Sequence, residues 1–104
     1  MEQGSGTPWG PARTVGEIAP GIHVVSTARH GGIHLDPEHA KQIPDDVRLA
    51  SFLKNATWFE EDYDWCIPFV LFEAEILAGN DETAKTVIKN GVHVARMKRN
   101  HPAI

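Results

Sequence analysis

The first half of the chain carries short apolar segments that predict β-strands. Residues 22–27 (IHVVST) are rich in β-branched side chains, and residues 12–19 mix apolar with polar positions as an edge strand does. The Pro20-Gly21 pair between them is a strong turn signal, because proline presets the first central position and glycine accepts a positive φ. We therefore predict a hairpin that turns at Pro20-Gly21, a loop over residues 28–32 and another short strand over residues 33–35.

Helix signals begin at residue 36. Asp36 followed by Pro37 predicts a capped helix start, and Pro44 ends this short helix. An acidic pair opens residues 45–54, whose apolar positions predict a second helix. Residues 57–60 are aromatic and are expected to be extended.

The most apolar segment, which starts at Asp62 or Asp64 and ends at residue 78, predicts a longer helix. Its large side chains recur at intervals of four, three and four residues, which places them on one helix face: Trp65, Phe69, Phe72 and Ile76. A proline at position 68 argues against a central strand but is tolerated in the first turn of a helix. Asp81 then caps a last helix that ends before Gly91, and residues 92–100 fit either a helix or a strand.

These elements predict an α+β fold in which a small N-terminal antiparallel hairpin or sheet packs on two to four helices. Residues 1–11 contain three glycines and two prolines and predict a flexible arm with Trp9 as its anchor. Residues 12–91 are expected to form a single globular domain, and residues 92–104 a basic C-terminal segment.

The composition of the chain excludes some classes of protein function. A formal net charge of −4 over 104 residues excludes a generally basic surface for nucleic acid, and no apolar stretch is long enough for a membrane span. The single cysteine, Cys66, excludes an internal disulfide, is typical of a reducing cytoplasm and is expected to be a buried small hydrophobe. The charge is unevenly divided, because residues 57–82 carry eight acids and no base whereas residues 83–104 carry five bases and no acid. Such an acidic block faces solvent, binds cations or meets basic groups of the tail or of a partner.

Two stretches carry candidate chemistry. In the first, residues 26–32, hydroxyls, a cation, an imidazole and two glycines succeed one another, so that backbone amides and Arg29 could present donors to an anion. A tight turn with solvent-facing Arg29 and His30 is the alternative. In the second, residues 58–65, four carboxylates within five positions lie among aromatic residues and could coordinate a hard cation or hold a proton between like charges. The alternative there is a helix cap with further acids near the helix N-terminus.

Metal binding is a less favoured interpretation of these two stretches than the binding of an organic ligand. The carboxylates lack the spacing of a calcium loop, and the chain has one cysteine and no H-E-x-x-H motif. We therefore predict no metal and no cofactor. A site that joins His30 or His34 to Glu61 and Asp62 through the fold stays open as the alternative.

Several stretches, in order, resemble a family of small domains of unknown function found in phages, plasmids and bacteria. They are Trp9-Gly10, Ala19-Pro20-Gly21-Ile22, Ser26-Thr27-Ala28-Arg29-His30-Gly31-Gly32-Ile33, Pro44, and Trp58-Phe59-Glu60-Glu61-Asp62-Tyr63-Asp64-Trp65. The similarity covers roughly residues 8–75, and its specific parts are a Ser-Thr-x-x-His-Gly-Gly stretch and an aromatic-Glu-Glu-Asp stretch.

The resemblance implies that the two stretches form one ligand-binding site. Its expected members are Ser26, Thr27, Arg29, His30, Gly31, Gly32, Trp58, Glu60, Glu61 and Asp62. Such a site suits a nucleotide-like ligand, with phosphates on the glycine loop, the base on an aromatic face and carboxylates on the ribose or base.

The leading hypothesis is a phage- or mobile-element-type protein that binds a small polar, nucleotide-derived signalling ligand to counter host defence. It would act in the cytoplasm, that of the host if phage-encoded, and an oligomer would supply further pocket walls; no membrane or direct nucleic-acid partner is expected. One alternative is an enzyme that acts on such a ligand with His30 as acid or base and Glu61 or Asp62 as partner or metal ligand. Another is an inhibitor that meets a basic protein through the acidic block.

Overall fold

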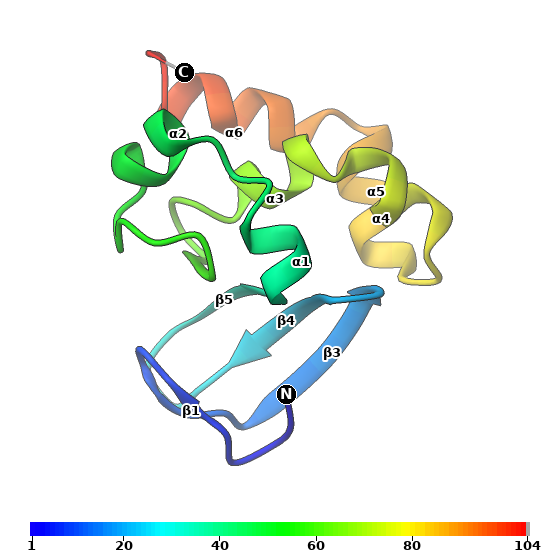
Figure 1. The fold of residues 1–104 in the computed structure, drawn as a ribbon. Coiled ribbons are helices and arrows are strands. Elements are labelled where there is room, and N and C mark those ends of the chain that lie inside the picture. Colours follow the sequence, from blue (N-terminus) through cyan, green and yellow to red (C-terminus); the bar gives the residue numbers. More distant parts are fainter. Residues whose placement is uncertain (104) are drawn as a thin grey trace.

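A four-stranded antiparallel sheet and six helices make up the computed structural model, which describes residues 1–103 and shows an α+β fold (Figure 1). The strands follow the chain order β3-β4-β5-β6, with bounds Thr14–Ala19, Ile22–Ser26, Gly31–Leu35 and Trp58–Glu60. The predicted hairpin is confirmed, because β3 and β4 pair around Gly21, whose φ is +81°. Upstream, β1 (Gly6–Thr7) and β2 (Gly10–Pro11) form a two-stranded hairpin of their own within the segment predicted to be an arm.

The six helices lie together on one side of the sheet (Figure 1). In chain order they are α1 (Pro37–Ala40), α2 (Asp45–Ala50), α3 (Cys66–Leu71), α4 (Glu73–Ala78), α5 (Glu82–Lys89) and α6 (Val92–Asn100). Asp36 and Asp81 cap α1 and α5 as predicted, each accepting a hydrogen bond from a backbone N–H three residues on. Gly91 follows α5 with a φ of +70°, and residues 92–100, which the sequence left undecided, form α6. None of the helices in residues 1–103 is long and apolar enough to cross a membrane.

Three expectations differ from the structure. The fold has six helices instead of two to four for two reasons. The single helix predicted up to residue 78 is divided at Phe72, which leaves helical geometry with φ −114° and ψ 29°, and residues 92–100 form a further helix. The loop predicted over residues 28–32 is shorter, because β5 already begins at Gly31. The helix predicted over residues 45–54 ends at Ala50.

The core lies between the sheet and the helices. Alternation along the strands sends one set of side chains, among them Ile22, Ile33 and Phe59, to the helical side, where Ile67 and Ile76 meet them. All five are at most 3% exposed. Cys66 is fully buried, as predicted. The spacing of the large apolar side chains between Trp65 and Ile76 thus identified core residues correctly, although the predicted helix is divided in two.

The opposite face of the sheet carries polar and aromatic side chains in two rows. One row crosses all four strands at paired positions, in the order Glu17, His23, His34 and Trp58. The next row places Gly32 between Val25 and Glu60. Since Trp9 of the N-terminal hairpin packs against the Gly32 position and against Trp58, with ring centroids 5.6 Å apart for the two tryptophans, the hairpin covers this second face.

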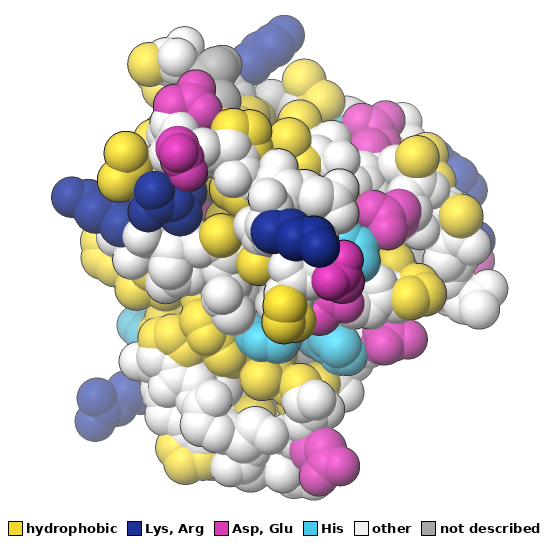
Figure 2. Space-filling model, viewed as in Figure 1, with side chains coloured by type: hydrophobic (Ala, Val, Ile, Leu, Met, Phe, Trp, Pro, Cys, Tyr) yellow, Lys and Arg dark blue, Asp and Glu magenta, His cyan; other side chains and the backbone are white. Residues whose placement is uncertain are grey.

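Three acids of the acidic block form hydrogen bonds with histidines. His39 bonds Glu75 of α4, His93 of α6 bonds Glu73, and His101 bonds buried Asp64, with nitrogen-to-oxygen distances of 2.8, 3.1 and 2.9 Å. Figure 2 shows histidine and acidic side chains next to one another on the face it presents. Residues 83–104 therefore meet the acidic block through His93 and His101 as well as through Lys85, whose Nζ lies 3.5 Å from Glu82 Oε1.

Candidate functional site

The turn between β4 and β5 is organised by the hydroxyl of Thr27. This oxygen donates to the carbonyl of His30 at 2.7 Å and accepts from the amides of Arg29 and His30 at 3.2 and 3.1 Å. The Thr27 amide also donates to His30 O at 2.8 Å. The segment is therefore a tight turn that holds Arg29 and His30 at its tip, both exposed. The hydroxyl of Ser26 is engaged with that of Thr14 on β3.

Gly31 and Gly32 serve close packing. Both lie in β5, where Gly31 pairs with Ser26 and Gly32 pairs with Val25 and Glu60, and neither has a positive φ. A Cβ at position 32 would overlap the carbonyl of Phe59 and lie 2.7 Å from the Trp9 ring. The expected phosphate-binding glycine loop is therefore not formed, because strand pairing engages this backbone and the Trp9 indole fills the space above Gly32.

Four of the predicted site residues come together at the end of β6. One ligand atom from each of His30, Glu60, Glu61 and Asp62 lies within 4.8 Å of the others. The His30 Nδ1 atom is 3.9 Å from Glu60 Oε1, and the Asp62 amide donates to Glu60 Oε2 at 2.9 Å. Register explains the meeting: Gly32 pairs with Glu60 and the Glu61 amide donates to Gly31 O, so the turn tip and the acidic stretch face each other across β5 and β6.

Glu60 is the least exposed carboxylate of this cluster. Its side chain is 13% exposed, against 54% for His30. Burial raises the pKa of the Glu60 carboxyl, and the nearby charges of Asp62 and Glu61 act in the same direction, while the hydrogen bond from the Asp62 amide opposes them. One nitrogen and three carboxylate oxygens could hold a divalent cation, and exposed carboxylates also gather on surfaces that bind none. The absence of a metal stays a prediction.

A cavity of about 510 Å³ opens over this cluster, and we call it the carboxylate cavity. Two of its walls are the acids Glu60 and Asp62, and the others are His30 and three aromatic side chains: Trp9, Phe52 and Tyr63. Phe52 is 71% exposed, which is unusual for so large an apolar side chain. The cavity thus combines flat apolar surfaces with hydrogen-bond acceptors.

Hydrogen bonds fix the chain on the aromatic side of the carboxylate cavity. The fully buried Asp64 accepts from the amide of Phe52 at 2.6 Å and bonds His101 Nε2 at 2.9 Å. Burial raises the pKa of the Asp64 carboxyl, while the hydrogen bond from Phe52 and the nearby His101 act to lower it. The Tyr63 hydroxyl donates to the carbonyl of Asn100, and the Asn100 amide donates back to the Tyr63 carbonyl, at 2.7 and 3.0 Å. The C-terminal end of α6 therefore holds the cavity wall in place.

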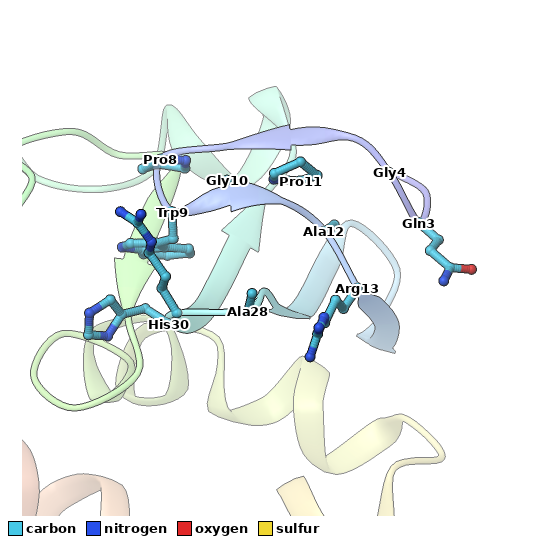
Figure 3. Close-up of a pocket in the computed structure, with 11 residues that line it drawn as sticks. Gln3, Gly4, Pro8, Trp9, Gly10, Pro11, Ala12, Arg13, Ala28 and His30 are labelled. Carbon is cyan, nitrogen blue, oxygen red and sulfur yellow. The ribbon is translucent and has the colours of Figure 1, made fainter.

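A second cavity, of about 900 Å³, lies on the other side of Trp9 and His30, and we call it the arginine cavity. It is formed by the N-terminal hairpin and the β4–β5 turn, and it is lined by Arg13, Ala28 and Arg29 in addition to the two shared residues. Figure 3 shows Trp9 and His30 at one end of this cavity, with Arg13 further along and Ala28 between them. The two cavities therefore share a wall.

The structure divides the predicted site residues into three groups. His30, Glu60 and Asp62 line the carboxylate cavity, and Arg29 lines the arginine cavity. Glu61 belongs to the carboxylate cluster but lines a different hollow beside Trp65. The remaining residues shape the turn and the sheet: Ser26, Thr27, Gly31, Gly32, and Trp58, whose ring packs against that of His34 at a tilt of 57° with centroids 4.5 Å apart.

Sequence reasoning did not place Phe52, Tyr63 or Arg13 at the site. Phe52 stood in a segment predicted to be helical, and an exposed phenylalanine cannot be told from a core one by its spacing alone. Trp9 was expected to anchor the arm, and this role is what brings the indole into both cavities.

Residues 2–98 match a family described as "Domain of unknown function (DUF7007)", so the chain belongs to this family. No curated protein and no solved structure matches the chain. The match takes in both cavities, from Trp9 to Tyr63.

Proposed function

We propose that this protein binds a small polar ligand with a planar, nucleobase-like part in the carboxylate cavity. The observation that carries the proposal is the composition of that cavity, which is lined by three aromatic side chains together with two carboxylates. An aromatic side chain can stack on a planar ring whatever substituents the ring carries, and carboxylates accept hydrogen bonds from ring N–H and amino groups.

The size of the cavity supports a ligand of this class. Small-molecule sites typically enclose about 300–1,000 Å³ and combine apolar walls with a few polar groups, and the carboxylate cavity, at about 510 Å³, lies within this range. The anchored wall adds to the argument, because the backbone amide of Phe52 and the hydroxyl of Tyr63 are held by hydrogen bonds to Asp64 and Asn100 before any ligand arrives. A preformed wall reduces the ordering that binding must impose.

Calorimetric titration of nucleosides, nucleotides, cyclic nucleotides and signalling derivatives of NAD tests the proposal. Phe52→Ala removes an exposed wall and is expected to weaken binding about tenfold, because base–aromatic stacking is worth about 1–3 kcal/mol. Leu49→Ala is the matched control: Leu49 is 57% exposed, lies in α2 three residues before Phe52 and does not line the cavity. The proposal fails if no compound binds, or if both variants bind like the wild type.

In a cell, capture of a nucleotide-derived signal would counter a defence system that depends on it, and this role in a phage or mobile element is part of the proposal. Expression in bacteria that carry a nucleotide-signalling defence system, followed by phage plating, measures it. The wild type is expected to restore plaques and Phe52→Ala to restore fewer. Equal plating with and without the protein would contradict the role.

An enzyme acting on such a ligand is the second candidate, and the carboxylate cluster favours it. An imidazole beside a partly buried carboxyl, 3.9 Å away, is a pairing found in general acid–base catalysis. Chromatography of each nucleotide after incubation would reveal turnover. Product formation that is lost in His30→Ala and kept in Lys98→Ala would support an enzyme, and unchanged ligands in every case would exclude it for the compounds tested.

A further inference from the structure

We propose that the arginine cavity binds the anionic group, a phosphate or phosphate ester, of the ligand whose planar part occupies the carboxylate cavity. The inference rests on the proposed function and adds to it the orientation and the charge of the ligand. Its basis is the charge of the two cavities on either side of Trp9 and His30.

The lining of the arginine cavity is cationic. Arg13 and Arg29 are the charged side chains there, together with the titratable His30, and no acid takes part in the lining. Within residues 1–103, the ion pairs of lysine or arginine with a carboxylate are made by Lys41, Arg48 and Lys85. None of these three residues lines the arginine cavity. Neither guanidinium group of Arg13 and Arg29 makes a hydrogen bond or ion pair within residues 1–103, so their donors are available to a ligand. A planar guanidinium matches phosphate oxygens in a bidentate manner, which makes arginine well suited to this anion.

Both arginines start from fixed points of the backbone. The Arg13 amide donates to the carbonyl of Ser26 at 2.7 Å, and the Arg29 amide donates to the Thr27 hydroxyl at 3.2 Å. The two residues thus flank the end of β4: Arg13 immediately precedes β3, and Arg29 lies in the turn after β4. Arg13 is among the residues that line this cavity, and in the view of Figure 3 its side chain lies on the other side of Ala28 from His30 and points away from Trp9.

The shared wall links the two cavities into one extended site with opposite charge at its two ends. Glu60 and Asp62 repel an anion from the carboxylate cavity, and the arginines attract it to the other side of Trp9. A ligand with an amino-bearing ring at one end and a phosphate at the other meets both demands in one orientation only. In this proposal the two arginines bind the anion, and the backbone of Gly31 and Gly32, which is paired in the sheet, does not.

Titration of matched nucleosides and 5′-monophosphates of adenine, guanine, cytosine and uracil tests the inference, with pyrophosphate as a probe of the anion site alone. We expect the wild type to bind at least one monophosphate about tenfold or more tightly than its nucleoside. Arg13→Gln and Arg29→Gln should each reduce this preference, and together abolish it, without changing nucleoside affinity. Arg99→Gln, which removes an exposed charge of α6, is the matched control and should change neither.

The outcomes separate the two proposals. Nucleoside binding with no phosphate preference, or with a preference that survives Arg13→Gln/Arg29→Gln, overturns this inference and leaves the proposed function intact. Pyrophosphate binding that depends on the arginines, without any nucleoside or nucleotide binding, supports the anion site and overturns the proposed function. Binding of none of these probes overturns both.

Discussion

Replacing Glu75 with glutamine tests the bridge that His39 makes between the sheet and the helical layer. The His39 ring bonds Asp36 Oδ1, just after β5, at 2.6 Å and Glu75 Oε1 of α4 at 2.8 Å. Burial acts to lower the pKa of His39, but the hydrogen bonds to Glu75 and Asp36 outweigh burial and raise this pKa above its ordinary value. Glu75→Gln keeps an acceptor of the same size and removes the charge.

The expected loss follows from the exposure of the two side chains. That of His39 is 10% exposed and that of Glu75 is 48% exposed. The pair therefore lies between a surface ion pair, worth about 0–1 kcal/mol, and a buried one, whose disruption costs about 3–5 kcal/mol. We expect Glu75→Gln to lower the free energy of unfolding by about 1–2 kcal/mol at pH 6, or ~5–10 °C in melting temperature.

The loss should depend on pH. A histidine whose pKa is raised on folding contributes stability that is fully present below its unfolded pKa of 6.5 and is lost as the pH rises through the folded value. The difference between wild type and Glu75→Gln is therefore expected to be largest at pH 6 and to shrink towards pH 9. The backbone and side-chain hydrogen bonds of His39 lower the pKa of Asp36, which stays ionised throughout this window and adds no slope.

Urea unfolding followed by tryptophan fluorescence, repeated from pH 6 to pH 9, measures the free energy of each variant. Glu82→Gln is the control, because the Glu82 side chain is 80% exposed and only approaches Lys85, at 3.5 Å. Its effect should stay within about 0.5 kcal/mol at every pH. Equal losses for Glu75→Gln at pH 6 and pH 9, or no loss at pH 6, would refute the reasoning.

Three further predictions concern buried positions. Gly32→Ala should destabilise the protein by about 3 kcal/mol in urea unfolding, because the added Cβ has no room. Gly16→Ala is the control and should have little effect, because its Cβ would meet nothing within 4 Å. Equal effects of the two variants would contradict the close packing at Gly32. Asp64→Ala should cost about 3–5 kcal/mol in the same assay, while Asp45→Ala, at a 90% exposed side chain, should be near neutral; a neutral Asp64→Ala would refute the buried pair. Burial raises the pKa of Cys66 to about 11, so iodoacetamide at pH 8 should label it in urea but not in the native protein, and rapid native labelling would contradict its burial.

Local signals were sufficient for the regular elements of this fold. The Pro20-Gly21 turn and the Asp36 and Asp81 caps act through their own backbone, and the structure places each where the sequence predicted. The prediction of one long helix was wrong because the division of this helix at Phe72 depends on tertiary packing. Residues 66–69 are all buried, so α3 is covered on several sides, and a helix broken at Phe72 lets both halves reach the core.

The site was less predictable because it is assembled from distant parts of the chain. The acidic stretch and the turn of His30 were identified, yet their meeting depends on the register of β5 with β6. The glycine pair was misleading, since glycine marks both flexible turns and places where another group approaches closely, and only the position of Trp9 distinguishes the two. Which acid each histidine bonds is likewise decided by tertiary packing.

Trp9 makes both cavities dependent on how long the N-terminal hairpin stays docked. The bond from Gly4 N to Ala12 O lies within this segment, and the Thr27 hydroxyl of the β4–β5 turn donates to Trp9 O at 3.3 Å. Local opening of such a segment requires less free energy than global unfolding. Each time it lifts from the sheet, Trp9 leaves with it, and the shared wall of both cavities is lost at once. The residence time of a ligand enclosed there would be limited by this opening, and amide hydrogen exchange in residues 4–12 would report ligand occupancy directly.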